Sequence, residues 1–206
     1  MNYLNTVNKT WVLSRLAIEV MDMPKAYDKF FVETWVDSAL RSFTSRNFKI
    51  VGESGHVYGY GKSVWAMIDL DTRHPADILA VRGGLITEYI ETEYPCPIEK
   101  SSRVKLSVGA TPIRSIDTYY NDVDINGHIN SVKYIEHVLD LWDVAWYKQH
   151  CIRRFEIAYV AESHQGDRLH FYQEGRDSDT DFNVRITKSN RDSAEVEVCR
   201  CRVQFV

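Results

Sequence analysis

The chain has 206 residues, a formal net charge of −4 and an isoelectric point near 6.0, so its composition gives no reason to expect binding to nucleic acid. Hydrophobic residues make up 44% of the chain and aromatic residues 12%, enough for one large domain or two small ones. No stretch approaches the roughly 18 apolar residues of a membrane span, and the first residues lack a signal-peptide pattern. The four dispersed cysteines indicate reduced thiols in a cytoplasmic protein.

An internal repeat emerges when the sequence is compared with itself. An offset of 139 residues, the distance from Arg15 to Arg154, places Arg15–Ile18 over Arg154–Ile157. The same offset aligns the alternating segments that follow, Phe30–Val36 with Leu169–Gln173. Alternation of apolar and polar residues is typical of half-buried strands. The repeat therefore predicts two related units, each rich in antiparallel strands.

The boundaries of these units follow from turn and linker signals. We predict an N-terminal unit at 1–87, a linker at 88–102 that contains Pro95 and Pro97, and a C-terminal unit at 103–206. Polar turns at 52–55 and 189–193 are expected to close a hairpin in each unit. The predicted fold class is α+β, an antiparallel sheet wrapped on a long central helix and duplicated.

The repeat also predicts that the first unit is N-terminally incomplete. The second unit opens with a strand at Ile113–Tyr120 and a helix that reaches about residue 148, and most of their counterparts would lie before residue 1. Residues 2–9 match the tail of that missing helix. A sheet without its helix leaves apolar surface exposed to water, which costs a free energy of roughly 25 cal/mol per Å². We therefore expect a start site assigned too late, or a truncation.

A polar turn near the middle of the chain carries the main functional signal. Asp124, Asn126 and His128 occupy alternate positions, and Asn126 and Gly127 are poor residues for a helix interior, which predicts a turn before a helix. The helix dipole and the backbone N–H groups near Gly127 and His128 would face the group bound there. Such an end stabilises a carbonyl oxygen that gains negative charge in acyl transfer. The alternative is that Asp124 or Asn126 merely caps the helix.

The helix after this turn is predicted from its apolar stripe. Apolar residues recur at spacings of three and four, at Val132, Ile135, Val138 or Leu139, Trp142 and Trp146. Charged residues fall largely off the stripe. The pattern predicts one long, buried helix.

The motif Asp124-x-Asn126-x-His128-x-Asn130-x-x-x-Tyr134-Ile135 resembles the signature of the acyl-acyl-carrier-protein thioesterases of plants and bacteria. Other segments resemble landmarks of that family in the expected order: Trp11–Glu19, Glu33–Val36, Ser63–Met67, Thr72–Arg73 and Tyr159–Glu162. The resemblance runs from about Trp11 to the C-terminus. It implies a tandem hotdog fold in which the polar turn opens the central helix of the C-terminal hotdog.

The same resemblance implies a catalytic acid at Glu162, facing the turn. Ser163 stands where such enzymes often carry cysteine, and an unactivated serine is a weak nucleophile. We therefore expect hydrolysis by a water that Glu162 deprotonates with help from His128. Asp124 would orient His128 or share in the water network. Asn126, together with the backbone N–H groups of Gly127 and His128, would hold the carbonyl.

The family further implies hydrolysis of acyl-acyl carrier protein (acyl-ACP) to a free fatty acid and the carrier protein, which terminates fatty acid synthesis without metal or cofactor. The carrier protein is acidic, so basic residues are candidates for docking: Arg153, Arg154, Lys133, Arg41 and Arg46. The first half of such enzymes shapes the acyl pocket, and its candidate lining residues are Trp35, Trp65 and Met67.

Two rival interpretations remain open at this level. A hotdog hydrolase acting on acyl-coenzyme A would use the same chemistry, because the phosphopantetheine arm is common to both carriers. A truncated, inactive acyl-binding module would explain the short first unit, although the complete set of Asp124, Asn126, His128 and Glu162 argues against it. The sequence leaves open the acyl chain length and the oligomeric state, with a homodimer as one candidate.

Overall fold

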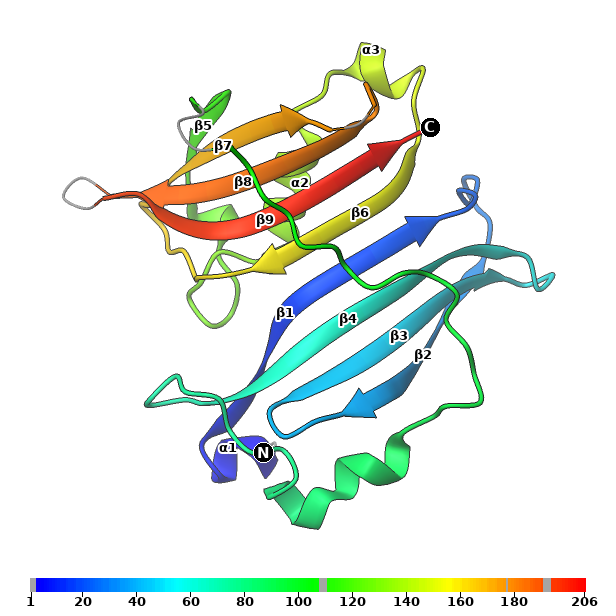
Figure 1. Ribbon diagram of the computed structural model, residues 1–206, viewed down its shortest axis with the longest axis vertical. Coiled ribbons are helices and arrows are strands. Elements are labelled where there is room, and N and C mark those ends of the chain that lie inside the picture. The colour runs from blue at the N-terminus through cyan, green and yellow to red at the C-terminus, as the bar shows by residue number, and fades with distance from the viewer. Residues whose placement is uncertain (1–2, 108–110, 177, 191–193) are drawn as a thin grey trace. The chain divides into compact units, whose positions relative to one another are not determined.

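The computed structural model describes residues 3–107, 111–176, 178–190 and 194–206. The chain folds as two compact units, Met1–Ser101 and Ser102–Val206, and each consists of an antiparallel sheet with short helical segments (Figure 1). The predicted α+β class is therefore confirmed. None of the helices among the described residues is both long and apolar enough to cross a bilayer.

The first unit is built on a four-stranded sheet in the order β2-β3-β4-β1. Its elements are α1 (Tyr3–Thr6), β1 (Lys9–Val20), β2 (Phe30–Ala39), β3 (Phe43–Gly52), β4 (Val57–Asp69) and the 3₁₀ helix η1 (Val81–Tyr89). The hairpin between β3 and β4 turns at residues 53–55, as predicted, and Gly55 adopts a φ of 83° that favours glycine.

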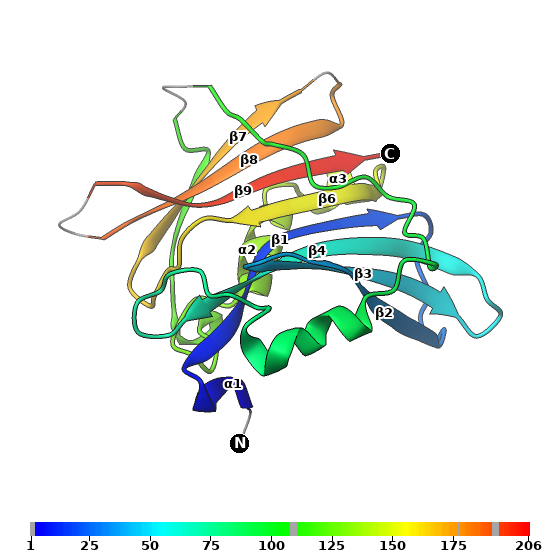
Figure 2. The ribbon, with the colours of Figure 1, turned by 60° about the horizontal axis from the view of Figure 1, so that its bottom comes forward.

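One buried cluster of the first unit joins its sheet to α1 and η1. Met67, Ala76 and Ile78 form a buried cluster, and further apolar side chains pack on it from α1, β1 and η1: Leu4, Trp11, Val81 and Ile86. Figure 2 shows η1 running along one face of this sheet. The short helix α1 lies within 2–9, where the repeat predicts the tail of a helix. That the first unit is N-terminally incomplete stays a prediction.

The second unit is built on a five-stranded sheet in the order β6-β9-β8-β7-β5. Its elements are β5 (Arg114–Asp117), the 3₁₀ helix η2 (Tyr120–Asp122), α2 (Ser131–Leu139), α3 (Val144–Tyr147), β6 (Ile152–Tyr159), β7 (Arg168–Gly175), β8 (Asp181–Ser189) and β9 (Val196–Phe205). The turn predicted at 189–193 lies partly outside the described residues.

The core of the second unit lies between α2 and one face of this sheet, and α2 is seen behind the strands in Figure 1. Tyr134 and Val138 of α2 are 3% and 0% exposed. The side chains from the strands that share this core alternate along each strand, as a period of two requires: Phe155, Ile157, Leu169, Phe171, Val184, Ile186, Cys199, Cys201 and Val203. This apolar burial anchors α2 and so fixes the position of the turn that precedes it.

The predicted long helix is wrong in its extent. α2 ends at Leu139, and Asp143 begins the separate helix α3 by accepting a hydrogen bond from the N–H of Trp146 at 2.8 Å. Aspartate favours such an N-cap because its side chain competes for backbone N–H groups. The break lets Trp142 and Trp146 pack edge-to-face against Phe205 at the end of the sheet. The apolar spacing therefore continues past residue 139, but the helix does not.

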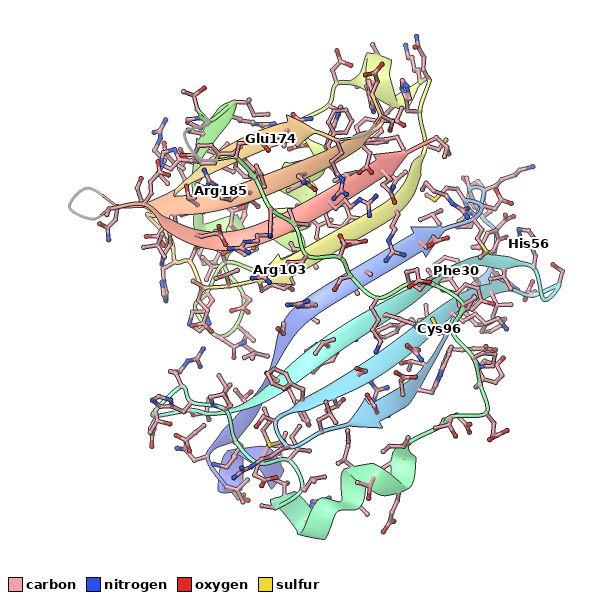
Figure 3. The ribbon with its side chains drawn as sticks, viewed as in Figure 1. Phe30, His56, Cys96, Arg103, Glu174 and Arg185 are labelled. Atoms are coloured by element: carbon pink, nitrogen blue, oxygen red, sulfur yellow. The ribbon has the colours of Figure 1, made fainter. Side chains whose placement is uncertain are left out.

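The segment that opens the second unit crosses the face of the sheet opposite α2. Ser102 donates hydrogen bonds from its N–H and its hydroxyl to Glu156, and the N–H of Ser107 donates to Glu174. Figure 3 labels Arg103 in this segment and Glu174 and Arg185 on the sheet beneath it. This outer face is polar, and α2 packs on the other face of the sheet.

Candidate active site

The polar turn is organised around the carboxylate of Asp124. Its Oδ1 accepts hydrogen bonds from the backbone N–H groups of Asn126 at 2.8 Å and His128 at 3.2 Å. Its Oδ2 accepts a hydrogen bond from Nδ2 of Asn126 at 3.3 Å. Gly127 adopts a φ of 84°, and a bridge between Val123 and Ile129 closes the turn. Asp124 therefore holds both Asn126 and His128 in place.

The same contacts determine the charge of Asp124. Partial burial raises the pKa of its carboxyl group. The pKa is lowered by a larger amount by hydrogen bonds from the backbone N–H groups of Asn126 and His128 and from the Asn126 amide. The net effect is a pKa below the ordinary value. Asp124 is therefore ionised at neutral pH and acts as an acceptor of hydrogen bonds.

The predicted free backbone donors of Gly127 and His128 are not available. The N–H of Gly127 donates to the carbonyl of Asp124 at 3.1 Å, and the N–H of His128 donates to the Asp124 carboxylate. The helix begins later than expected, because Asn130 is the N-cap and its side chain accepts the N–H of Val132. Neither Asp124 nor Asn126 caps the helix, so that alternative is wrong as well.

His128 and Glu162 face each other across the site. Nε2 of His128 lies 3.4 Å from Oε2 of Glu162, and the two side chains are 28% and 41% exposed. Glu162 comes from the loop after β6, and this loop is joined to the turn because the N–H of Ile129 donates to the carbonyl of Ser163 at 2.8 Å. The structure thus brings together Asp124, Asn126, His128 and Glu162, although Glu162 is far from the other three in sequence.

The neighbouring Ser163 faces the interior. Its side chain is 0% exposed, and its hydroxyl has no hydrogen-bond partner among the described residues. A nucleophile must reach the substrate and must be activated by a base. Burial removes Ser163 from the surface on which Glu162 is exposed.

Two residues near the site were missed by the sequence analysis. Nζ of Lys188 donates to the main-chain oxygen of Glu162 at 2.7 Å and to Oδ2 of Asp167 at 3.2 Å. The sequence of β8 does contain a signal for Lys188. Every second residue of the strand faces the same side, and Lys188 is a charged residue in the series that begins with Val184 and Ile186. A lysine at an inward-facing strand position is uncommon unless it is paired.

The candidate acyl-pocket residues do not lie together. Trp65 and Met67 share one face of the first sheet, whereas the strand register places Trp35 on the opposite face, where its ring packs edge-to-face on Tyr94. Met67 is 1% exposed and belongs to the core. Trp65 contributes to a cavity of about 260 Å³ in the first unit, lined by Trp11, Thr44, Arg46, Trp65 and Ile86.

The candidate docking residues differ in their environments. Arg154 is 6% exposed and forms an ion pair with Glu156 at 2.7 Å on the outer face of the sheet, so it is unsuited to dock a partner. Lys133 pairs with Glu136 along α2 at 2.7 Å. Arg153 is half-buried in β6. The prediction is therefore wrong for Arg154, and Lys133 and Arg153 remain candidates.

The other histidines of the second unit differ in their surroundings, and the ring of His164 packs edge-to-face on that of His128 with the centroids 5.0 Å apart. The ring nitrogens of His170 contact the hydroxyls of Ser115 at 2.8 Å and Ser189 at 2.7 Å. Nε2 of His137 lies 3.6 Å from Asp122. Within the part of the chain that the structure describes, no group of three or more His, Cys, Asp and Glu side chains is arranged to hold a metal ion.

Two family models match most of this chain. The family model for the acyl-ACP thioesterase N-terminal domain matches residues 1–81, and the model for the C-terminal domain matches residues 107–205. A palmitoyl-acyl carrier protein thioesterase of Gossypium hirsutum is 26% identical over 89% of this chain and 45% of its own length. An oleoyl-acyl carrier protein thioesterase of Arabidopsis thaliana is 28% identical over 76% of this chain and 45% of its own length. The chain spans about half the length of these curated relatives.

Solved structures agree with this placement. An acyl-ACP thioesterase from Bacteroides thetaiotaomicron is 49% identical and superposes with a TM-score of 0.89, covering 98% of this chain and 79% of its own. The 12:0-ACP thioesterase from Umbellularia californica has a TM-score of 0.82 at 21% identity, covering 98% of this chain and 77% of its own, and supports the hotdog fold. The chain belongs to the acyl-ACP thioesterase family.

Proposed function

We propose that this protein hydrolyses the thioester of acyl-ACP to a free fatty acid and the carrier protein, a reaction that terminates fatty acid synthesis. The observation that carries the proposal is the opposed pair of His128 and Glu162, 3.4 Å apart beside a turn that presents Asn126. A general base must lie within reach of the proton that it removes, directly or through one water. The exposure of the Glu162 carboxylate beside His128 supports this assignment.

The proposed reaction uses water as the nucleophile. Glu162, assisted by His128, removes a proton from the water as its oxygen attacks the thioester carbonyl carbon. The carbon–sulfur bond of the tetrahedral intermediate then breaks, and the departing phosphopantetheine thiolate takes up the proton. The products are the fatty acid and the thiol of the carrier protein. The buried hydroxyl of Ser163 takes no part.

The developing oxyanion requires a hydrogen-bond donor, and we assign this role to Nδ2 of Asn126. A carboxamide carries two N–H donors, of which one goes to Asp124 and the other can serve the substrate oxygen. The backbone N–H groups of Gly127 and His128 are already engaged within the turn. Asp124 accordingly orients the donor, and removing an oxyanion donor costs about 10²–10³-fold in rate.

We infer that the protein acts in the cytoplasm, which is consistent with four free cysteines and with a bacterial relative at 49% identity. An acidic carrier protein would meet Lys133 on α2 and Arg153 on β6. The acyl chain would bind in the cavity of the first unit to which Trp65 contributes. A homodimer stays a prediction.

The test is the release of free fatty acid from a panel of acyl-ACP thioesters, with the matching acyl-coenzyme A thioesters alongside. Glu162→Gln keeps the shape of the side chain but removes the base, so we expect kcat to fall about 10²–10⁴-fold without loss of folding. Glu53→Gln, at an exposed ion pair of the first unit, is the matched control and should keep wild-type rates. Near-wild-type turnover by Glu162→Gln would refute the assignment. Hydrolysis of coenzyme A thioesters alone would change the carrier but not the chemistry.

A further inference from the structure

Lys188 occupies an unusual position at the end of β8. The strand register pairs Lys188 with Leu169 and Ile186 with Phe171, so Lys188 shares the core-facing side of the sheet with three fully buried apolar residues. Its side chain is 22% exposed. Placing an ammonium group at the edge of a core costs free energy of desolvation unless hydrogen bonds replace the lost water. The partners of this ammonium group therefore indicate why a lysine is there.

Both partners lie in the loop 160–167 between β6 and β7, which carries the proposed base. The ammonium group donates to the main-chain oxygen of Glu162 at 2.7 Å and pairs with Oδ2 of Asp167 at 3.2 Å. The same carboxylate oxygen of Asp167 accepts the N–H of His164 at 3.0 Å. One lysine thus links Glu162, near the start of the loop, to Asp167 at its end, and Asp167 in turn accepts the N–H of His164.

Other contacts hold the rest of the loop. The hydroxyl oxygen of Thr118 lies 2.9 Å from the carbonyl oxygen of His164 and 2.7 Å from that of Asp167, so the two carbonyls share its single hydrogen. The N–H of Ile129 donates to the carbonyl of Ser163. The carbonyl of Glu162 accepts a hydrogen bond from the ammonium group of Lys188, and the residues on either side of Glu162 are held by backbone hydrogen bonds to Val198 and Ile129. Lys188 therefore adds a contact at Glu162 itself to those that hold its neighbours.

We propose that Lys188 is a positioning residue, which fixes the main chain of Glu162 through its own ammonium group and Asp167 so that the carboxylate faces His128. The inference rests on the proposed hydrolytic role of Glu162. The ammonium and the Asp167 carboxylate neutralise each other, so the pair constrains geometry and adds no net charge to the site. Geometry is what the reaction needs, because a misplacement of about 1 Å can cost about 10²-fold in rate.

Lys188→Met tests the proposal, because methionine preserves an unbranched apolar stem and removes the charge. We expect kcat to fall about 10- to 100-fold while KM changes by less than about twofold, since Lys188 acts through Glu162 and not on the substrate. Lys188→Arg keeps the charge and two or more donors, and should recover most of the lost kcat. A merely structural role would lower the melting temperature without this division between kcat and KM.

Lys9→Met is the matched control. Lys9 and Asp69 form an equivalent pair in the first unit, 3.1 Å apart with both side chains 25% exposed. Loss of this pair should lower the melting temperature by a similar amount and leave kcat unchanged. Equal losses of kcat in Lys9→Met and Lys188→Met would show a general effect of stability and would overturn the proposal.

A double-mutant cycle gives the sharpest kinetic test. If Lys188 acts through Glu162, then adding Lys188→Met to Glu162→Gln leaves the residual rate unchanged, because the base is already absent. Independent, multiplicative losses would refute the positioning role. Wild-type kcat in Lys188→Met would refute it as well, and would leave the role of Glu162 intact.

A measurement that needs no turnover separates this inference from the proposed function. The ¹⁵N signals of the His128 ring report the carboxylate opposite it. In Lys188→Met they should shift in the direction seen for Glu162→Gln, and in Lys9→Met they should stay at their wild-type positions. Unchanged His128 signals in Lys188→Met would overturn the inference even if the protein hydrolyses acyl-ACP. Conversely, shifted signals in a protein without hydrolytic activity would refute the proposed function alone.

Discussion

Replacing Asp124 with asparagine isolates the contribution of one charge to the geometry of the turn. The carboxamide of Asp124→Asn would keep an oxygen able to accept the N–H groups of Asn126 and His128, now at 2.8 and 3.2 Å. The second carboxylate oxygen becomes an NH₂ group that faces Nδ2 of Asn126, at present 3.3 Å away. Two donors then oppose each other, so the amide of Asn126 loses its anchor.

The size of the effect follows from the number and kind of hydrogen bonds lost. Bonds to a charged acceptor contribute about 1.5–3 kcal/mol and neutral ones about 0.5–1.5 kcal/mol, so each of the two N–H bonds weakens by about 1 kcal/mol. Asp124 is partly exposed, and water replaces part of this loss. We expect the native turn to be destabilised by about 1–2 kcal/mol, which lowers the ratio of native to non-native turn by a factor of roughly 5–30. The kcat of Asp124→Asn should fall by up to this factor.

The assay is steady-state hydrolysis of an acyl-ACP at neutral pH, with the melting temperature measured in parallel. Asp143→Asn is the matched control, because Asp143 also accepts a backbone N–H, that of Trp146 at 2.8 Å, but caps α3. It should lose stability and keep kcat. Undiminished kcat in Asp124→Asn, or an equal loss in Asp143→Asn, would refute the role of the Asp124 charge in orienting the site.

Two further predictions concern thiols and acid. Burial raises the pKa of Cys199 and Cys201, which are both 0% exposed, whereas Cys151 is exposed. Alkylation of the native protein at neutral pH should therefore modify Cys151 and spare the other two. Peptide mass mapping after alkylation measures this. Rapid modification of Cys199 would contradict the described core. The hydrogen bond from the backbone N–H of Thr72 lowers the pKa of Asp69 to about 2. Because the folded pKa lies below the unfolded one, the stability that Asp69 contributes is complete above about pH 4 and is lost as the pH falls toward 2. Urea midpoints should therefore depend less on pH in Asp69→Asn than in the wild type, and equal slopes would contradict this.

Much of the second unit could be predicted from local patterns. Strand alternation and the apolar spacing before residue 140 predict an antiparallel sheet on a helix, because each pattern reports which side of its own element is buried. The polar turn was recognisable for the same reason, since Asn126 and Gly127 are poor residues for a helix interior. The grouping of Glu162 with this turn came from the family resemblance, and in the structure its carboxylate lies 3.4 Å from the His128 ring.

The interpretation of individual side chains depended on contacts that are distant in sequence. In the sequence Arg154 resembles a surface charge. In the structure it pairs with Glu156, which also accepts a hydrogen bond from Ser102 in the segment that crosses this face of the sheet. The backbone N–H groups of Gly127 and His128 appear available until the turn closes on Asp124. A strand pattern gives the faces of one strand, but it does not give the register that places Trp35 opposite Trp65.

Patterns in the sequence were enough to predict the α+β class and the polar turn, because periodicity and motifs are properties of neighbouring residues. Which backbone donors are already engaged, and which side chains contact the loop of Glu162, followed only from the tertiary structure. Lys188 shows the reason most clearly. Its ammonium reaches the main chain of Glu162, 26 positions away along the chain, and a hydrogen bond of this kind exists only after the sheet has assembled.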